Sequence, residues 1–464
     1  MPGAPETDAP PAALLLRFTF PIDDVSLTQA QQVLSGKVVN WSELGGPDLP
    51  IELLGSDGND VVTVNALDFS SLPPRPSEAL LAAVAGHPGS LALVQWDGPY
   101  LHTKGLSING WRPDEAGYPL QIERPAGQRA TPTNRTVAID SSRSDSRVSV
   151  AAGGDLMLGR RVSLAADGQA LDYPLNLLGP DLADVDIGLA NLEVALTQGG
   201  EAVRKDYTFR AAPALAAGLR RSGITLVSLA NNHVLDFGPV GLANTIAALD
   251  QAGVKHSGAG KDEESAATPA IFTIRGTRLA ILSFVNVPND SITGFIASSM
   301  SAGPGYPGVN WGTVEAVQRQ VSAARLQADS VIVTLHAGDE YAEQPNQVQR
   351  SLAHTAIDAG AALVIGAHPH VLQGIEYYRD GLILYSLGNL VFDLDRDDVS
   401  HLGIAAAQTV IARLVFKDGR VDGLDLRPAV IDSAQYRPVP ASGSAARSVL
   451  DRIYRLTDAL AASH

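Results

Sequence analysis

The chain has 464 residues, of which 45% are hydrophobic and 18% are charged, and its formal net charge is −16. At about 100–200 residues per domain, this length predicts two to three domains with enough apolar residues for a large core. The acidic balance argues against a nucleic-acid-binding surface, which needs basic side chains to neutralise phosphates. The absence of cysteine excludes disulfides, thiolate metal sites and cysteine nucleophiles.

The first twenty residues, MPGAPETDAPPAALLLRFTF, lack a basic region followed by a long apolar run. They therefore predict neither a signal peptide nor a membrane span. No other stretch reaches the roughly 18 consecutive apolar residues that a span needs. We expect a soluble chain in which any targeting segment is missing.

The chain order suggests two folded units joined by a linker. Residues 1–12 are rich in Pro and Ala, and a first folded unit is expected over residues 14–123. Residues 124–147 combine Pro, Gly, Ser, Thr and Arg with almost no apolar periodicity, which is typical of a linker. The second unit is expected over residues 148–435, with a C-terminal helical segment over 436–464.

Within the second unit, helical stretches alternate with short runs rich in Val, Ile and Leu, which predicts a layered α/β sheet. Three dipeptides typical of two-residue turns predict hairpins at Arg275-Gly276, Asp380-Gly381 and Asp418-Gly419. A last helix is expected from about Ala445 to Ala462. It should pack on the body through apolar residues at helical spacing, namely Val449, Leu450, Ile453, Leu456 and Leu460.

Polar side chains that can bind metals follow six successive apolar runs. Ligands of open α/β sheets bind outside the carboxyl ends of the strands, so we expect these side chains to converge on one site. They are Asp155, Asn191, Glu193, Asn231, Asn232, His233, Asp236, His336, Asp339, Glu340, His368, His370 and Asn389.

The residue types in this set suit divalent cations, because carboxylate and amide oxygens and imidazoles are their usual ligands. An acidic residue between two ions can bridge them at about 3.5–4 Å, and a neighbouring histidine can protonate a leaving group. His368 and His370 alternate in an Ala-His-Pro-His segment that we expect to be extended, so both imidazoles should face one side. Taken singly, each residue also has a structural reading, such as a turn cap for Asp155 or a core histidine for His336.

Six segments in this order resemble the CapA family of poly-γ-glutamate capsule biosynthesis proteins over about residues 148–393: GDLMLGR, LANLEVALT, LANNHVLDFG, TLHAGDEY, GAHPHVLQG and YSLGNLVFD. That domain is similar to the calcineurin-like metallophosphoesterases. The resemblance implies a four-layer α-β-β-α sandwich, beside a smaller N-terminal α/β domain. It also implies an extracytoplasmic protein of the cell envelope, which acts on an anionic polymer or on a small phosphoester or amide substrate, in or near a membrane polymer-synthesis complex.

Carried over residue by residue, the resemblance implies one or two divalent ions (Mn, Zn, Fe or Mg). Their ligands would be Asp155, Glu193, Asn232, His336, His368 and His370, with Glu193 as the bridging acid. His233 matches the general acid, and Asn191, Asn231, Asp236, Glu340 and Asn389 would contact the substrate or support the ligands.

One departure from the pattern is important for function. Met157 stands where the first motif has a histidine, so one ion would lose a nitrogen ligand. This leaves open the alternative of a non-catalytic polymer-binding or assembly component with a vestigial metal pocket.

The first unit resembles another family in the segment VLSGKVVNWSELGGPDLPIELL, which is similar to type-2 periplasmic solute-binding domains. Only about one lobe's worth of chain is present, so we expect a retained packing domain. A solute receptor acting through this unit remains the alternative.

Overall fold

The computed structural model describes residues 12–57, 60–63, 76–96, 99–109, 111–113, 118–120 and 147–462. The chain divides into two compact units, one of residues 1–145 with 422–425, and the other of residues 146–421 with 426–464. Nearly all of the expected linker, residues 124–147, lies outside the described residues. No helix within the described ranges is both long and apolar enough to cross a bilayer.

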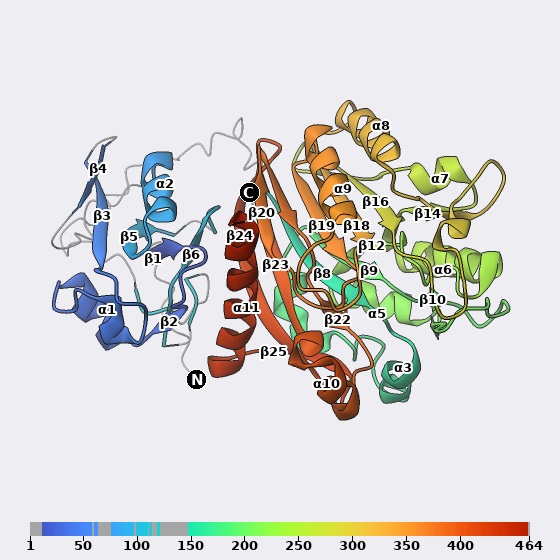
Figure 1. Ribbon diagram of the computed structural model, residues 1–464, viewed down its shortest axis with the longest axis horizontal. Helices are drawn as coiled ribbons and strands as arrows, with labels where there is room; N and C mark the ends of the chain where they lie inside the picture. Colours follow the sequence, from blue (N-terminus) through green and yellow to red (C-terminus); the bar gives the residue numbers. More distant parts are fainter. Residues whose placement is uncertain are drawn as a thin grey trace, which may run out of the picture. The chain divides into compact units, whose positions relative to one another are not determined.

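The N-terminal unit contains a five-stranded sheet in the order β4-β3-β5-β1-β6 (Figure 1). Strand β1 is buried on both faces: Leu14 and Leu16 pack with helix α1, whereas Leu15 packs with helix α2. The strand is therefore a continuous apolar run rather than an alternating one. Its elements are β1 (Ala12–Arg17), β2 (Asp24–Val25), α1 (Leu27–Leu34), β3 (Glu52–Asp57), β4 (Asp60–Thr63), α2 (Glu78–Gly86), β5 (Ser90–Gln95), β6 (Thr103–Gly105) and β7 (Ser107–Ile108).

The C-terminal unit holds a first large sheet in the order β13-β12-β9-β8-β23-β24-β25, with β22 also paired to β8. Strands β8, β9, β12 and β13 run parallel, so their carboxyl ends lie at one edge. The strands are β8 (Val148–Leu156), β9 (Ile187–Leu192), β12 (Ile224–Ser228), β13 (Lys255–Ser257), β22 (Asn389–Val391), β23 (Gln408–Lys417), β24 (Arg420–Asp432) and β25 (Arg437–Pro440).

A second sheet in the same unit has the order β15-β16-β18-β19-β21-β20. On β18, Val331, Val333 and Leu335 pack against helices α8 (Val314–Arg325) and α9 (Gln347–Asp358). Thr334 and His336 therefore face the other way. Strand β8 of the first sheet contacts β19 of the second, so the two sheets lie against each other. The strands are β15 (Ala270–Ile274), β16 (Thr277–Asn286), β18 (Ser330–Ala337), β19 (Leu363–Ala367), β20 (Ile375–Tyr378) and β21 (Gly381–Leu384).

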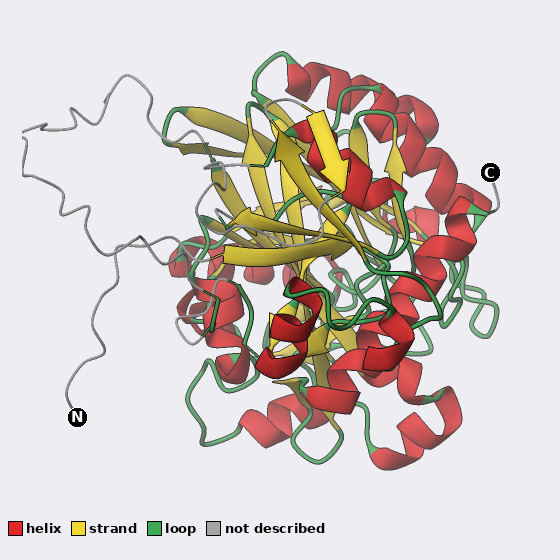
Figure 2. Cartoon of the chain, turned by 90° about the vertical axis from the view of Figure 1, so that its left-hand side faces the viewer, coloured by secondary structure: helices red, strands yellow, loops and turns green. Residues whose placement is uncertain are grey.

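The C-terminal unit also contains α-helices, which Figure 2 colours red. They are α3 (Arg160–Ala166), α4 (Gly179–Ala183), α5 (Leu215–Arg221), α6 (Gly238–Ala252), α7 (Glu263–Ala267), α8 (Val314–Arg325), α9 (Gln347–Asp358), α10 (Arg396–Leu402) and α11 (Gly443–Ala461). Two short strand pairs complete the unit: β10 (Ala195–Leu196) with β11 (Arg210–Ala211), and β14 (Ala259–Gly260) with β17 (Gly308–Val309). Helix α11 contacts β20 and β23 and buries the five apolar residues predicted for it. The expected α/β class is confirmed, whereas the four-layer arrangement stays a prediction.

Two of the three predicted hairpins turn where the sequence indicates. Arg275-Gly276 and Asp418-Gly419 have positive φ at both residues, as this class of tight turn requires. The third prediction is wrong by one residue, because Gly381 pairs with Tyr378 and the turn is Arg379–Asp380. Gly381 serves packing instead, since a Cβ there would lie 2.4 Å from Ile357 of α9.

Candidate metal centre

Asp155 lies at the carboxyl end of β8, between two neighbouring strands. It pairs with Asn191 of β9 on one side and with Asn389 of β22 on the other. The preceding Gly154 permits this, because a Cβ there would lie 1.8 Å from the carbonyl oxygen of Gly388. The Asp155 amide donates to that same oxygen at 3.0 Å, so the paired glycines place the carboxylate at the centre of the strand edge.

Glu193 follows β9 and is completely buried. Neither of its carboxylate oxygens has a hydrogen-bond partner among the described residues. Its Oε1 lies 3.6 Å from His336 Nε2, 3.9 Å from His370 Nε2 and 4.0 Å from His233 Nε2. A buried carboxylate without hydrogen bonds is costly, and a bound cation would relieve that cost.

Three groups of side chains bring their potential ligand atoms within 4.8 Å of one another. They are Asp155 with Glu193 and His370, Glu193 with His336 and His368, and Glu340 with His368 and His370. Asn232 joins the second group, since its Oδ1 lies 2.8 Å from His336 Nε2. The six ligands predicted from the sequence therefore do lie together, and these groups could hold a metal ion.

The two histidines of the Ala-His-Pro-His segment converge for a reason other than the predicted one. Strand β19 ends at Ala367, and both His368 and His370 have positive φ, 97° and 57°. The extended-segment prediction is therefore wrong, because the chain turns sharply at this point. Left-handed backbone at non-glycine residues costs about 1–3 kcal/mol and concentrates at functional sites.

Two asparagines orient the imidazoles that face the carboxylates. Asn389 Oδ1 lies 2.9 Å from His370 Nδ1, and the Asn191 side chain donates to Asp155 Oδ1 at 2.8 Å and lies 3.0 Å from His336 Nδ1. Such partners fix the ring and leave the other nitrogen free to bind. The prediction that Asn389 follows a strand is wrong, because it begins β22.

Asn231 shapes the backbone and also donates to Asn191 Oδ1 at 3.2 Å. Its side chain donates to the Leu192 carbonyl oxygen at 2.8 Å and accepts from the backbone amides of His233 and Val234. It therefore holds the turn that presents Asn232 and His233.

His233 belongs to a chain of three polar side chains. Its Nδ1 lies 2.7 Å from Asp236 Oδ2, and Lys205 Nζ donates to Asp236 Oδ1 at 2.8 Å. Phe209 packs on the imidazole with ring centroids 4.2 Å apart. Sequence reasoning missed Lys205, because it follows no apolar run and only the fold brings it to Asp236.

Charges within the centre shift several pKa values. Burial and the neighbouring Asp155 raise the pKa of Glu193 well above its usual value. Burial lowers the pKa of His336 to about 3 and that of His368 well below the usual histidine value. Burial alone would also lower the pKa of His370, but Glu193 and Asp155 outweigh it and raise that pKa to about 10. The carboxylates thus attract positive charge, which a proton on His370 or a metal cation can supply.

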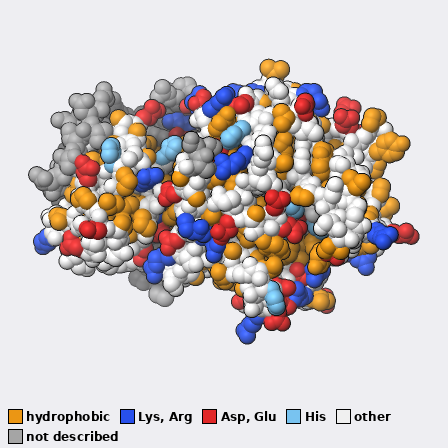
Figure 3. All heavy atoms as spheres, in the orientation of Figure 1, with side chains coloured by type: hydrophobic (Ala, Val, Ile, Leu, Met, Phe, Trp, Pro, Cys, Tyr) orange, Lys and Arg blue, Asp and Glu red, His pale blue; other side chains and the backbone are white. Residues whose placement is uncertain are grey.

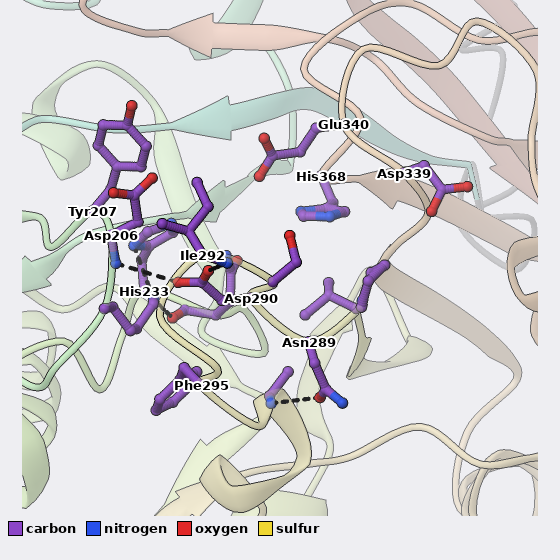
Figure 4. A pocket seen from close by; sticks show the side chains of 16 residues that line it. Asp206, Tyr207, His233, Asn289, Asp290, Ile292, Phe295, Asp339, Glu340 and His368 are labelled. Carbon is purple, nitrogen blue, oxygen red and sulfur yellow. Dashed lines mark hydrogen bonds between the residues drawn. The ribbon is translucent and has the colours of Figure 1, made fainter.

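A pocket of about 300 Å³ opens beside these groups. His233, His368 and Glu340 line it together with Lys205 and Phe295 (Figure 4). The pocket therefore gives a small group access to the candidate metal centre.

On the visible face of the molecule, acidic and basic side chains are interspersed (Figure 3).

Comparison with known proteins identifies the family. The family described as bacterial capsule synthesis protein PGA_cap matches residues 149–394, more than half of the chain. The chain belongs to this family.

Two curated relatives carry names that agree with this assignment. The capsule biosynthesis protein CapA of Bacillus anthracis is 29% identical over 70% of this chain and 77% of its own length. The PGA biosynthesis protein CapA of Bacillus subtilis (strain 168) is 32% identical over 58% of this chain and 68% of its own length. The predicted resemblance of the second unit to the CapA family is confirmed.

The resemblance of the first unit to solute-binding domains is not confirmed by these comparisons. An ABC-type phosphate transport receptor from Vibrio cholerae is 13% identical over 22% of this chain and 48% of that chain, with a TM-score of 0.18. A score this low carries no argument, so the solute-binding resemblance stays a hypothesis.

Proposed function

We propose that this PGA_cap family member is a metal-dependent hydrolase that acts on phosphoester or amide bonds of a cell-envelope polymer. The observation that carries this proposal is the wholly buried Glu193, whose two oxygens lack partners among the described residues and face three histidines. His368 Nδ1 is likewise buried without a partner there. Orphaned carboxylate and imidazole atoms in one cluster fit a divalent cation.

The ligands would be Asp155, Glu193, Asn232, His336, His368 and His370. When bound, divalent cations polarise a phosphoryl or carbonyl oxygen and make water a better nucleophile near neutral pH. The pocket beside Glu340 and Phe295 is open to the group that would react.

His233 would handle the proton of the leaving group. Asp236 holds its Nδ1, and Lys205 holds Asp236, so Nε2 is the nitrogen left to act. His233 also lines the pocket, where that nitrogen can reach a substrate. A histidine fixed in this way is suited to general acid–base work.

The polymer assignment comes from the relatives, whose names connect them with capsule and PGA biosynthesis. We propose that this chain likewise acts on an anionic polymer such as poly-γ-glutamate, outside the cytoplasm and beside a membrane polymer-synthesis complex. A small phosphoester or amide remains an alternative substrate for the same site.

A second candidate function rests on Met157. This side chain occupies the position where the related pattern has a histidine, and it is buried in the hydrophobic core. With one nitrogen ligand fewer, the centre would serve as a non-catalytic polymer-binding or assembly component.

Two measurements on the full chain, its metal content and its hydrolytic activity, distinguish the two proposed functions. For a hydrolase, elemental analysis should find stoichiometric metal, and bis-p-nitrophenyl phosphate or γ-glutamyl-p-nitroanilide should be cleaved. His233→Ala should lower the rate about 10²–10⁴-fold, as expected for a lost proton donor. His401→Ala is the control, because His401 is exposed on α10. Bound metal without cleavage of either compound would favour the binding component.

A further inference from the structure

Two hydrogen bonds join the loop after β18 to the segment that contains the His368–His370 turn. The Tyr341 amide donates to the Pro369 carbonyl oxygen at 2.7 Å, and Gln373 Nε2 donates to the Ala342 carbonyl oxygen at 2.7 Å. Strands β18 and β19 are parallel neighbours, so both loops leave the same edge of the sheet. Glu340 precedes these two anchor points, and its position is therefore set by the backbone.

The Glu340 side chain reaches the two histidines of that turn. A carboxylate oxygen of Glu340 and one nitrogen each of His368 and His370 lie within 4.8 Å of one another. Figure 4 shows Glu340 beside His368, whereas the carboxylate of the adjacent Asp339 points away from both. Because His368 is 4% exposed and its Nδ1 has no described partner, this cluster has ligand capacity that hydrogen bonds do not use.

Asp155, Glu193 and His370 form one group of potential ligands, and the Met157 side chain does not join it. Met157, at the sequence position of the expected histidine, is 0% exposed and packs in the core, with its sulfur accepting from the Gly159 amide at 3.1 Å. That group supplies three protein ligands, and a second group supplies Glu193, Asn232, His336 and His368. Glu340 belongs to a third group, with His368 and His370.

We propose that Glu340 is a direct ligand of the metal centre, acting together with His368 and His370. This role differs from the substrate contact or ligand support predicted from the sequence. It rests on the metal centre of the proposed function and not on the hydrolysis of any particular bond.

The test measures manganese binding to the metal-free full chain by calorimetry and by electron paramagnetic resonance. The wild type should bind two Mn²⁺ ions and show an exchange-coupled two-manganese spectrum. Glu340→Gln should weaken binding at one site by about tenfold or more and remove the coupled spectrum.

Asp339→Asn is the matched control, because it removes one charge from the same loop at a side chain that Asn346 holds at 3.0 Å. It should leave both manganese affinities unchanged. Glu340 is exposed, so Glu340→Gln should keep the wild-type unfolding temperature without metal. His336→Ala, on β18, should instead weaken manganese binding at the site that Glu340→Gln leaves intact.

The inference is overturned if Glu340→Gln retains both wild-type manganese affinities, or if Asp339→Asn weakens binding equally. A wild type that binds no divalent cation would overturn both this inference and the metal chemistry of the proposed function. A wild type that binds two ions and cleaves nothing would overturn the hydrolase proposal alone.

Discussion

Two buried glutamates of the C-terminal unit lie among histidines and differ in how they are paired. Glu376 of β20 accepts a hydrogen bond from the Tyr385 hydroxyl at 2.6 Å, and both its oxygens lie 3.0 Å from His354 Nε2. Glu193 has histidine nitrogens at 3.6–4.0 Å and no hydrogen bond to either oxygen within the described structure. The same residue types thus stabilise the fold where their polar atoms are paired and create a candidate cation site where they are not.

The largest expected difference between the two glutamates is in their response to metal. Adding Mn²⁺ at about 100 times its Kd should raise the free energy of unfolding of the wild type by about 2.7 kcal/mol. Glu193→Gln should abolish this gain, because it removes the carboxylate proposed as a metal ligand, whereas Glu376→Gln should keep it. Thermal unfolding with and without Mn²⁺ measures both effects, and an equal gain in all three proteins would refute the assignment of Glu193.

The next effect is on the free energy of unfolding without metal. Here Glu376→Gln, and not Glu193→Gln, should have the larger effect. Glu376→Gln should lower the free energy of unfolding by about 1–3 kcal/mol, because Tyr385 and His354 lose a charged acceptor in a buried setting. Glu193→Gln should change it by less than about 1 kcal/mol, since no hydrogen bond is lost. Urea unfolding of the metal-free proteins compares them, and a larger loss for Glu193→Gln would contradict the contrast.

The smallest effect is expected at Asp186, a paired carboxylate that is partly exposed. Burial alone would raise its pKa, but Arg275 and the amide and hydroxyl of Ser149 outweigh burial and hold the pKa of Asp186 below its usual value. The stability it contributes is therefore complete above the ordinary aspartate pKa of about 3.9 and is lost as the pH falls through the lower folded value.

Because solvent screens the Asp186–Arg275 pair, the contribution should be below about 1 kcal/mol. The difference in urea midpoint between wild type and Asp186→Asn should be present at about pH 6 and smaller at about pH 3. A difference that grows as the pH falls would show that Asp186 is not stabilised as the anion.

Much of the candidate centre was predictable, because strand ends can be recognised from the pattern. Asp155 and Asn232 follow apolar runs of the first sheet, and His336 follows an apolar run of the second. Within each sheet, parallel neighbours carry such strand ends to one edge. The turn at His368 and His370 was not predictable, since nothing in a histidine's identity indicates a positive φ. Lys205 was missed for a related reason: its partner Asp236 is 31 residues away, and only folding joins them.

The sequence by itself determined the alternation of helices and strands, the polar residues at the strand ends and the membership of a capsule synthesis family, because these depend on local periodicity and on motif order. Only the tertiary structure decided which polar atoms find partners. It left the Glu193 oxygens without partners among the described residues and paired those of Glu376. It also brought Glu340 to the His368–His370 turn through a backbone hydrogen bond between two loops. Such pairing depends on distances of a few ångströms between residues far apart in the chain, and these exist only once the two sheets have packed.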